Sequence, residues 1–155
     1  MKKILITYGT RPLAQRIAKS LVDKFEVKFA TSESVPSVLM QQYYAIPNAA
    51  NPTFSHQLLK LCLDNQINYL LPLGLKELES LSEAKLLFEE YDILLIGPDA
   101  EQLKHTFVLS NPNKDLEVMV VDRGVNLIDG KAVELDASGL IVFSDEGEEY
   151  ALCTI

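Results

Sequence analysis

The chain has 155 residues, of which 48% are hydrophobic and 23% are charged, and its formal net charge is −8. This composition is typical of a globular protein that is long enough to bury a core. The negative charge disfavours binding to nucleic acid or to an anionic membrane, because both are negatively charged themselves. No apolar run approaches the roughly 20 residues of a membrane-spanning helix. Cys62 and Cys153 are isolated from each other and from histidine, which predicts buried thiols and a cytoplasmic location.

Residues 2–21 predict a buried strand, a tight turn and a helix. Ile4–Thr7 form a short run rich in β-branched residues, as expected for a strand covered on both faces. Gly9 is expected to make the turn, because glycine tolerates any φ. Thr10 is expected to cap the helix, and Pro12 suits its first turn. An apolar stripe follows at helical spacing, formed by Leu13, Ile17 and Leu21.

Strands and helices then alternate as far as about residue 109. Strands are predicted at 25–31, 43–46, 67–73 and 92–96, and helices at 35–42, 54–65, 76–91 and 98–105. This alternation predicts an α/β fold: a Rossmann-like, three-layer unit with a parallel sheet and right-handed crossovers.

The pattern changes in the last part of the chain. Short apolar runs at 117–121, 125–128, 132–135, 140–143 and 150–155 are separated by turns rich in Asp and Gly. Such turns favour hairpins, so we expect a small antiparallel β-meander. The predicted organisation is an α/β domain at 1–109 and a β-rich extension at 115–155, packed on it or on a second copy. A homodimer formed partly through the extension is favoured, and the alternative is that the extension covers one edge of the sheet in a monomer.

Ligands of open α/β sheets bind beyond the carboxyl ends of the strands. The predicted ligand-binding residues at this edge are Gly9, Thr10, Arg11, Thr31, Ser32, Gly74 and Glu77. Arg11 would pair with an anionic group, backbone N–H groups near Gly9 would hold it, and Glu77 would accept a hydrogen bond from an amine or hydroxyl. The alternatives are that Arg11 is simply solvated and that Glu77 complements the dipole of its helix.

Other chemistry is not indicated. The dinucleotide fingerprint G-x-G-x-x-G is incomplete, because Arg11 and Ala14 occupy its second and third glycine positions. Glu33 lies near the place of a ribose-binding acid, but the incomplete glycine set favours a polar loop residue. We predict no catalytic residues, no cofactor and no metal site. The carboxylates of the extension are expected to be solvated; they are Glu134, Asp136, Asp145, Glu146, Glu148 and Glu149.

Four segments together resemble the N-terminal pre-ATP-grasp domain of carbamoyl-phosphate-synthase-like ATP-grasp ligases. They are the glycine turn at Gly9, the YAIP segment Tyr44–Pro47, the strand–helix junction Asn68–Glu77 and the segment Ile93–Pro98. Asn68 replaces an acidic residue of the family pattern. The resemblance covers about two-thirds of the chain and implies a Rossmann-like fold. In complete ligases the domain leads into an ATP-binding lid and a catalytic core, and the residues after Pro98 do not match these parts.

The expected function is therefore a stand-alone, non-catalytic domain that binds a small anionic ligand or serves as a partner subunit. One alternative is one chain of a split ligase, with a separate ATP-grasp chain as its partner. A second alternative is a Rossmann-like enzyme that binds a nucleotide or nucleotide sugar. The latter follows from the segment YGTRPLA at 8–14, which is similar to the opening of non-hydrolysing nucleotide-sugar 2-epimerases, although Leu13 replaces an acidic residue.

Overall fold

The computed structural model describes residues 1–145, 147 and 149–155. Two of the carboxylates considered above, Glu146 and Glu148, lie outside the described residues. The first half of the chain forms a five-stranded parallel sheet, sheet A, in the order β3-β2-β1-β4-β5. Its strands are β1 (Lys2–Ile6), β2 (Phe25–Thr31), β3 (Tyr43–Ala45), β4 (Tyr69–Leu71) and β5 (Leu94–Leu95). This confirms the predicted Rossmann-like α/β fold.

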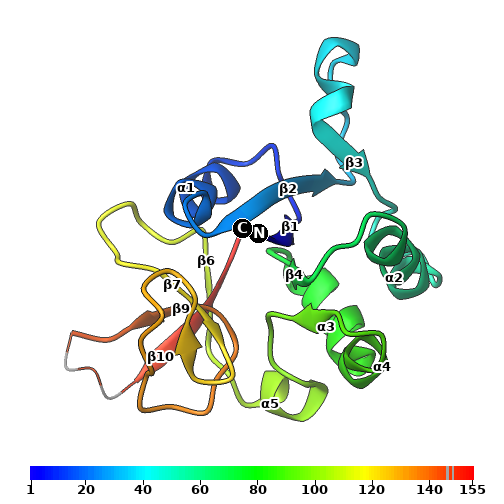
Figure 1. Ribbon diagram of the computed structural model, residues 1–155. Coiled ribbons are helices and arrows are strands. Elements are labelled where there is room, and N and C mark those ends of the chain that lie inside the picture. The colour runs from blue at the N-terminus through cyan, green and yellow to red at the C-terminus, as the bar shows by residue number, and fades with distance from the viewer. Residues whose placement is uncertain (146, 148) are drawn as a thin grey trace.

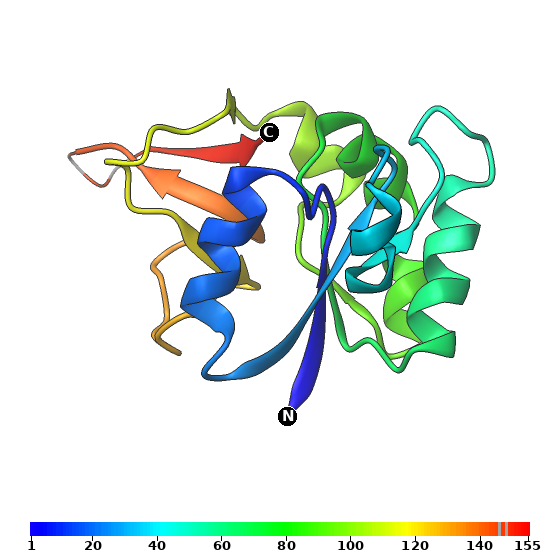
Figure 2. The same cartoon turned by 90° about the horizontal axis from the view of Figure 1, so that it is seen from above.

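Helices cover both faces of sheet A (Figures 1 and 2). α1 (Pro12–Leu21) covers one face, and α2 (Phe54–Asp64), α3 (Leu75–Glu83) and α4 (Lys85–Glu90) cover the other. The 3₁₀ helix η1 (Ser37–Gln42) and the short helix α5 (Ala100–Lys104) bury none of their own residues. The single helix predicted at 76–91 is wrong: it breaks at Ala84, whose backbone leaves the helical region at φ −101° and ψ 5°. In the described part of the chain, no helix has the length and apolar character needed to cross a membrane.

A second sheet, sheet B, contains five strands in the order β6-β10-β9-β7-β8. They are β6 (Val108–Ser110), β7 (Met119–Asp122), β8 (Val125–Asn126), β9 (Gly139–Phe143) and β10 (Tyr150–Thr154). Three of its pairings are antiparallel, but β6 pairs with β10 in parallel, so the sheet is mixed rather than a simple antiparallel meander. The long segment between β6 and β10 makes this possible, since parallel neighbours need a long connection.

The strand predicted at 132–135 does not form. Ala132 makes one isolated bridge to Val125. Beyond it the backbone curls through two short-range hydrogen bonds, in which Leu135 N donates to Val133 O and Ala137 N donates to Leu135 O. These bonds use backbone groups that a regular strand would present to a neighbouring strand.

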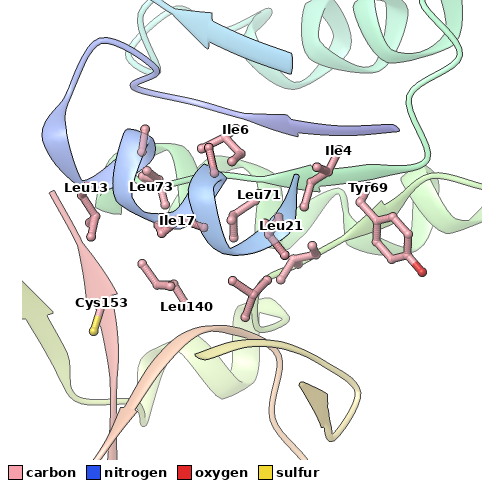
Figure 3. Packing of buried hydrophobic residues seen from close by; sticks show 14 of the residues in the cluster. Ile4, Ile6, Leu13, Ile17, Leu21, Tyr69, Leu71, Leu73, Leu140 and Cys153 are labelled. Atoms are coloured by element: carbon pink, nitrogen blue, oxygen red, sulfur yellow. The ribbon is translucent and has the colours of Figure 1, made fainter. Parts of the chain in front are cut away.

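Sheet B packs over α1 and one face of sheet A. The buried residues Leu13 and Ile17 of α1 belong to one hydrophobic cluster with Leu71 of β4 and with Leu140 and Cys153 of sheet B (Figure 3). A second cluster fills the opposite face of sheet A, where Phe54, Leu58 and Cys62 of α2 pack with Leu81 and Phe88. The molecule therefore has α1 and sheet B on one side of sheet A and α2, α3 and α4 on the other, as Figure 2 shows.

The turn between β1 and α1 differs from its prediction in two respects. Tyr8, not Gly9, takes the left-handed conformation, with φ 50°. Gly9 is instead required by close packing, because a Cβ atom there would lie 2.5 Å from Cβ of Phe29. The helix cap is Arg11 rather than Thr10, with Pro12 as the first helical residue. Since proline pre-sets the helical φ, α1 begins here without a side-chain cap.

Candidate functional site

The carboxyl edge of sheet A collects the residues predicted to bind a ligand. β1 and β4 are neighbours, but the chain leaves β1 towards β2 and leaves β4 towards β5, on opposite sides. This divergence is the topological switch point at which open α/β sheets bind their ligands. Gly9, Thr10 and Arg11 follow β1, and the other predicted residues follow β2 and β4. The edge divides into a buried half around Glu77 and an open half around Arg11.

Glu77 lies at the centre of the buried half. It is only 2% exposed, and its Oε1 accepts hydrogen bonds from the Thr7 hydroxyl at 2.5 Å and from the backbone N–H of Gly74 at 3.3 Å. The hydroxyl of Thr7 in turn accepts from Leu73 N at 2.8 Å. Burial raises the pKa of Glu77 to about 7, although these hydrogen bonds act in the opposite direction. Glu77 therefore ties the ends of β1 and β4 together.

Tyr8 connects the two halves. The Tyr8 ring packs on Gly74, where an added Cβ atom would lie 2.5 Å from Cε2 of the tyrosine and would require the ring to shift. On its other side, the guanidinium of Arg11 lies 5.9 Å from the centre of the same ring. The pKa of Tyr8 is raised by burial and then by the negative charges of Glu77 and Glu33, while Arg11 opposes the shift. Sequence reasoning did not select Tyr8 or Thr7, although a threonine that ends an apolar run is a polar group needing a partner.

Arg11 and Glu33 form the open half. Nε and Nη2 of Arg11 each donate to one Glu33 carboxylate oxygen at 2.8 Å, a bidentate pair. The side chains are 48% and 34% exposed. The hydrogen bond from Arg11 lowers the pKa of Glu33, and the same contact raises the pKa of Arg11. Thr10 also donates to Glu33, at 3.3 Å, and Thr31 accepts from the Glu33 backbone N–H at 3.0 Å.

Two backbone N–H groups at and near Gly9 are already engaged. Gly9 N donates to Ala30 O, and Arg11 N donates to Tyr8 O, both at 3.0 Å. Neither group is free to hold an anion, although the sequence analysis predicted that backbone N–H groups near Gly9 would do so. The guanidinium of Arg11 is different, because it has five N–H donors and the pair with Glu33 uses two of them. Three N–H donors of the Arg11 side chain are therefore left for an anion at this edge.

A small cavity of about 220 Å³ opens beside Glu33. Its lining is mostly apolar and consists of Thr31, Glu33, Ser34, Val35, Met40, Tyr43 and Ala45. Ser32 is half-buried next to Thr31 but does not line this cavity. A larger cavity of about 520 Å³ lies between α4, α5 and the loops of sheet B, and its lining contains none of the predicted site residues. We take the smaller cavity as the candidate site because it lies at the carboxyl edge of sheet A, although the other cavity is larger.

Among the described residues, no group of three or more His, Cys, Asp or Glu side chains is placed so that it could hold a metal ion. The arrangement instead offers hydrogen-bond donors at Arg11, an acceptor at Glu33 and an apolar surface beside them. These groups can bind and orient a small molecule.

Two solved structures resemble this fold. The biotin carboxylase domain of a single-chain bacterial carboxylase aligns with a TM-score of 0.49 and 17% identity, over 67% of this chain and 25% of that chain. The second is the biotin carboxylase domain dimer of Hydrogenobacter thermophilus 2-oxoglutarate carboxylase, in complex with MgADP, ADP and bicarbonate. It aligns with a TM-score of 0.45 and 20% identity, over 66% of this chain and 24% of that chain. The chain thus spans about a quarter of the length of these structures. A search of curated proteins finds no match.

A family model also matches this chain. Residues 4–96, more than half of the sequence, match the model described as PylC-like, N-terminal domain. The matched segment contains all seven predicted site residues and all of sheet A except the first two residues of β1. It also contains the motifs on which the predicted resemblance to pre-ATP-grasp domains was based, except for the last two residues of the segment Ile93–Pro98, and that resemblance is confirmed. The chain therefore belongs to the family of PylC-like N-terminal domains, the pre-ATP-grasp domains of ATP-grasp enzymes.

Proposed function

We propose that this domain is a non-catalytic binding partner of an ATP-grasp catalytic core and that it holds a small anionic ligand at the carboxyl edge of sheet A. The observation that carries the proposal is the position of Arg11. Its guanidinium is fixed by Glu33 at the open half of the edge and keeps three N–H donors beyond the two that the pair uses. Family membership supports the partnership with an ATP-grasp core, either in the same polypeptide or, as in a split ligase, in a separate one.

The pair with Glu33 suits such a role. A guanidinium held by two parallel hydrogen bonds loses little further freedom when an anion arrives, so less binding energy is spent on ordering it. Glu33 would weaken the attraction of Arg11 for an anion, since it neutralises the charge. The expected affinity is therefore modest, and the selectivity comes from the direction of the free N–H groups rather than from charge alone.

Arg11→Ala tests the proposal. A panel of inorganic phosphate, carboxylates and sugar phosphates is first screened by thermal shift, since a ligand that binds only the native state raises Tm. For anions that bind, the variant should lose roughly 1.5–3 kcal/mol in calorimetric titration, the typical value of a charge-assisted hydrogen bond. Lys19→Ala, on the exposed side of α1, is the matched control. Equal affinities in wild type and Arg11→Ala would remove Arg11 from the site.

The same domain should neither hydrolyse ATP nor bind it tightly by itself. In an ATP-grasp enzyme, ATP binding and hydrolysis are expected to depend on the lid and the catalytic core. Titration calorimetry with MgATP is the direct measurement, and a dissociation constant in the low-micromolar range would contradict this part of the proposal.

A homodimer through the β-rich extension remains a prediction. β6 precedes this extension in the chain but pairs with its last strand, β10, and forms an edge of sheet B. Its first residue, Val108, is 38% exposed, and Phe107 just before it is 78% exposed. An exposed apolar edge of this kind favours association. Light scattering should therefore give twice the monomer mass for the wild type and the monomer mass for Phe107→Glu. A wild-type monomer at high protein concentration would contradict the prediction.

A further inference from the structure

We propose that the open half of the edge binds a nucleoside 5′-monophosphate, with the phosphate at Arg11, the ribose hydroxyls at Glu33 and the base in the cavity beside Tyr43. This inference rests on the proposed function, which assigns Arg11 to an anion, and it names the rest of the ligand. The three contact points come from three consecutive parts of sheet A, namely the loops after β1 and β2 and the strand β3.

The arrangement along the edge supports a nucleotide. In doubly wound sheets a ligand phosphate lies at the first strand–helix turn, and an acid after the second strand binds the ribose hydroxyls. Arg11 caps α1 directly after β1, and Glu33 stands two residues after the end of β2. Their bidentate contact shows that these positions are close enough to be spanned by one small molecule.

Both charged groups retain capacity for a ligand. A carboxylate offers about four lone-pair sites. Glu33 receives two hydrogen bonds from Arg11 and one from Thr10, which leaves one site for a hydroxyl. Arg11 keeps three donors for the phosphate. A ribose phosphate can therefore be bound without separating the pair, and the exposed Thr10 hydroxyl can turn away to release a further lone pair of Glu33.

The cavity provides the place for the base. Its volume of about 220 Å³ is below the roughly 300–1,000 Å³ typical of pockets for whole drug-sized ligands. It therefore suits one part of a ligand whose remainder lies along the open edge. Tyr43 lies with its ring 6.1 Å from the ring of Phe29, and Phe29 packs against Gly9. This contact holds the aromatic wall in position, where a flat base can stack on it.

The turn after β1 selects a monophosphate over a dinucleotide. In the dinucleotide fingerprint the second glycine lets the backbone approach a pyrophosphate, and the third allows close packing of helix and strand. Ala14, fully buried, still allows this packing. Arg11 replaces the second glycine, and the N–H groups of Gly9 and Arg11 are bonded within the protein. The N–H groups of Gly9 and Arg11 are therefore not available to the phosphate, and the Arg11 side chain is the group proposed to hold it.

Titration of the full chain with AMP, adenosine and inorganic phosphate separates the three contacts. Ala45→Phe should fill the cavity and abolish binding of AMP and adenosine while leaving phosphate unchanged. Glu33→Gln should weaken the binding of AMP and of adenosine about tenfold, the equivalent of roughly 1.4 kcal/mol. For the same reason, 2′,3′-dideoxyadenosine should bind the wild-type protein about tenfold more weakly than adenosine does. Arg11→Ala should weaken the binding of AMP and of phosphate but not the binding of adenosine.

The matched control is Lys60→Ala, which breaks the exposed pair between Lys60 and Asp64 on α2 and should change none of these affinities. Retained melting temperatures show that each variant is folded. If AMP binds no better than phosphate, or adenosine does not bind, the nucleotide inference is wrong while anion binding by Arg11 stands. If a zwitterionic amino acid such as leucine binds the wild type and AMP does not, the cavity serves a different ligand and the inference is likewise overturned.

Discussion

Glu77 and Glu33 lie at the same carboxyl edge of sheet A but in opposite environments. Glu77 is 2% exposed and accepts from Thr7 and Gly74, so its carboxyl group belongs to the packing of β1 against β4. The side chain of Glu33 is 34% exposed and is paired with an exposed arginine. Burial raises the pKa of Glu77, whereas hydrogen bonding lowers that of Glu33. The comparison indicates that one half of the edge is structural and that the other half is available to a ligand.

Glu77→Leu should produce the largest loss of stability. The substitution leaves the Thr7 hydroxyl and the Gly74 N–H without their buried acceptor, and each unsatisfied group costs roughly 1–3 kcal/mol. Chemical denaturation should show a lower midpoint with an unchanged slope. Glu79→Leu, an exposed position on the same helix, is the control and should stay close to wild type. Equal midpoints for the two variants would mean that Glu77 does not hold the strand ends.

The stability of the wild type should also fall as the solution becomes more alkaline. The pKa of Glu77 is about 7 in the folded protein, above the ordinary value of 4.5, so the folded state binds the proton more strongly. The resulting stabilisation is fully present below about pH 4.5 and is lost as the pH rises through about 7, with a total on the order of 3 kcal/mol.

Glu77→Gln isolates this effect. Glutamine keeps an acceptor oxygen but does not titrate, so the difference in unfolding free energy between variant and wild type should shift in favour of the variant between pH 5 and pH 8. Parallel stability curves for the two proteins over this interval would contradict the raised pKa of Glu77.

Gly9→Ala should have an intermediate effect, and it tests the support of the open half. The added methyl group would meet Cβ of Phe29 at 2.5 Å, and a clash with an atom so close to the backbone is not relieved by a simple rotation. Overpacking of this kind costs typically about 1–3 kcal/mol. The shift of Phe29 should also displace Tyr43, so ligand affinity should fall together with Tm. Gly130→Ala is a useful comparison, because a Cβ atom there meets nothing within 4 Å, although its φ of 76° adds strain.

Glu33→Gln should have the smallest effect on stability. Exposed ion pairs contribute little, because water and salt screen them. The melting temperature should remain near that of the wild type at neutral pH, while ligand affinity changes. A large fall in Tm would place Glu33 in the structural half of the edge and would remove the distinction between the two glutamates.

Local patterns predicted much of sheet A correctly. The β-branched run at Ile4–Thr7, followed by Gly9 and Pro12, predicted the first strand, turn and helix, and the alternation beyond it predicted the parallel sheet. Helical periodicity alone did not reveal the break at Ala84, because the apolar stripe continues across it and neither glycine nor proline marks it. The parallel partner of β10 was also missed, since pairing with β6 depends on where α5 directs the chain.

The site was only partly predictable for a related reason. The sequence singled out Arg11 and Glu77 individually, but not what each contacts. The partners are distant in the chain: Arg11 contacts Glu33, and Glu77 of α3 contacts Thr7, which follows β1. The left-handed conformation of Tyr8 could not be predicted either, because the adjacent glycine is the residue to which such a turn would ordinarily be assigned.

The packing of β10 has a consequence for how the protein folds. Cys153 is buried in the same cluster as Leu13 of α1, and Ile155 N donates to Leu73 O at 2.9 Å, so the last strand contacts the first helix and the central strand region. Contacts between residues so far apart in sequence require a large loop to close before they contribute any stability. Such topologies fold more slowly than those built from local contacts. During synthesis, the part of α1 that packs against Cys153 therefore stays uncovered until β10 has been made.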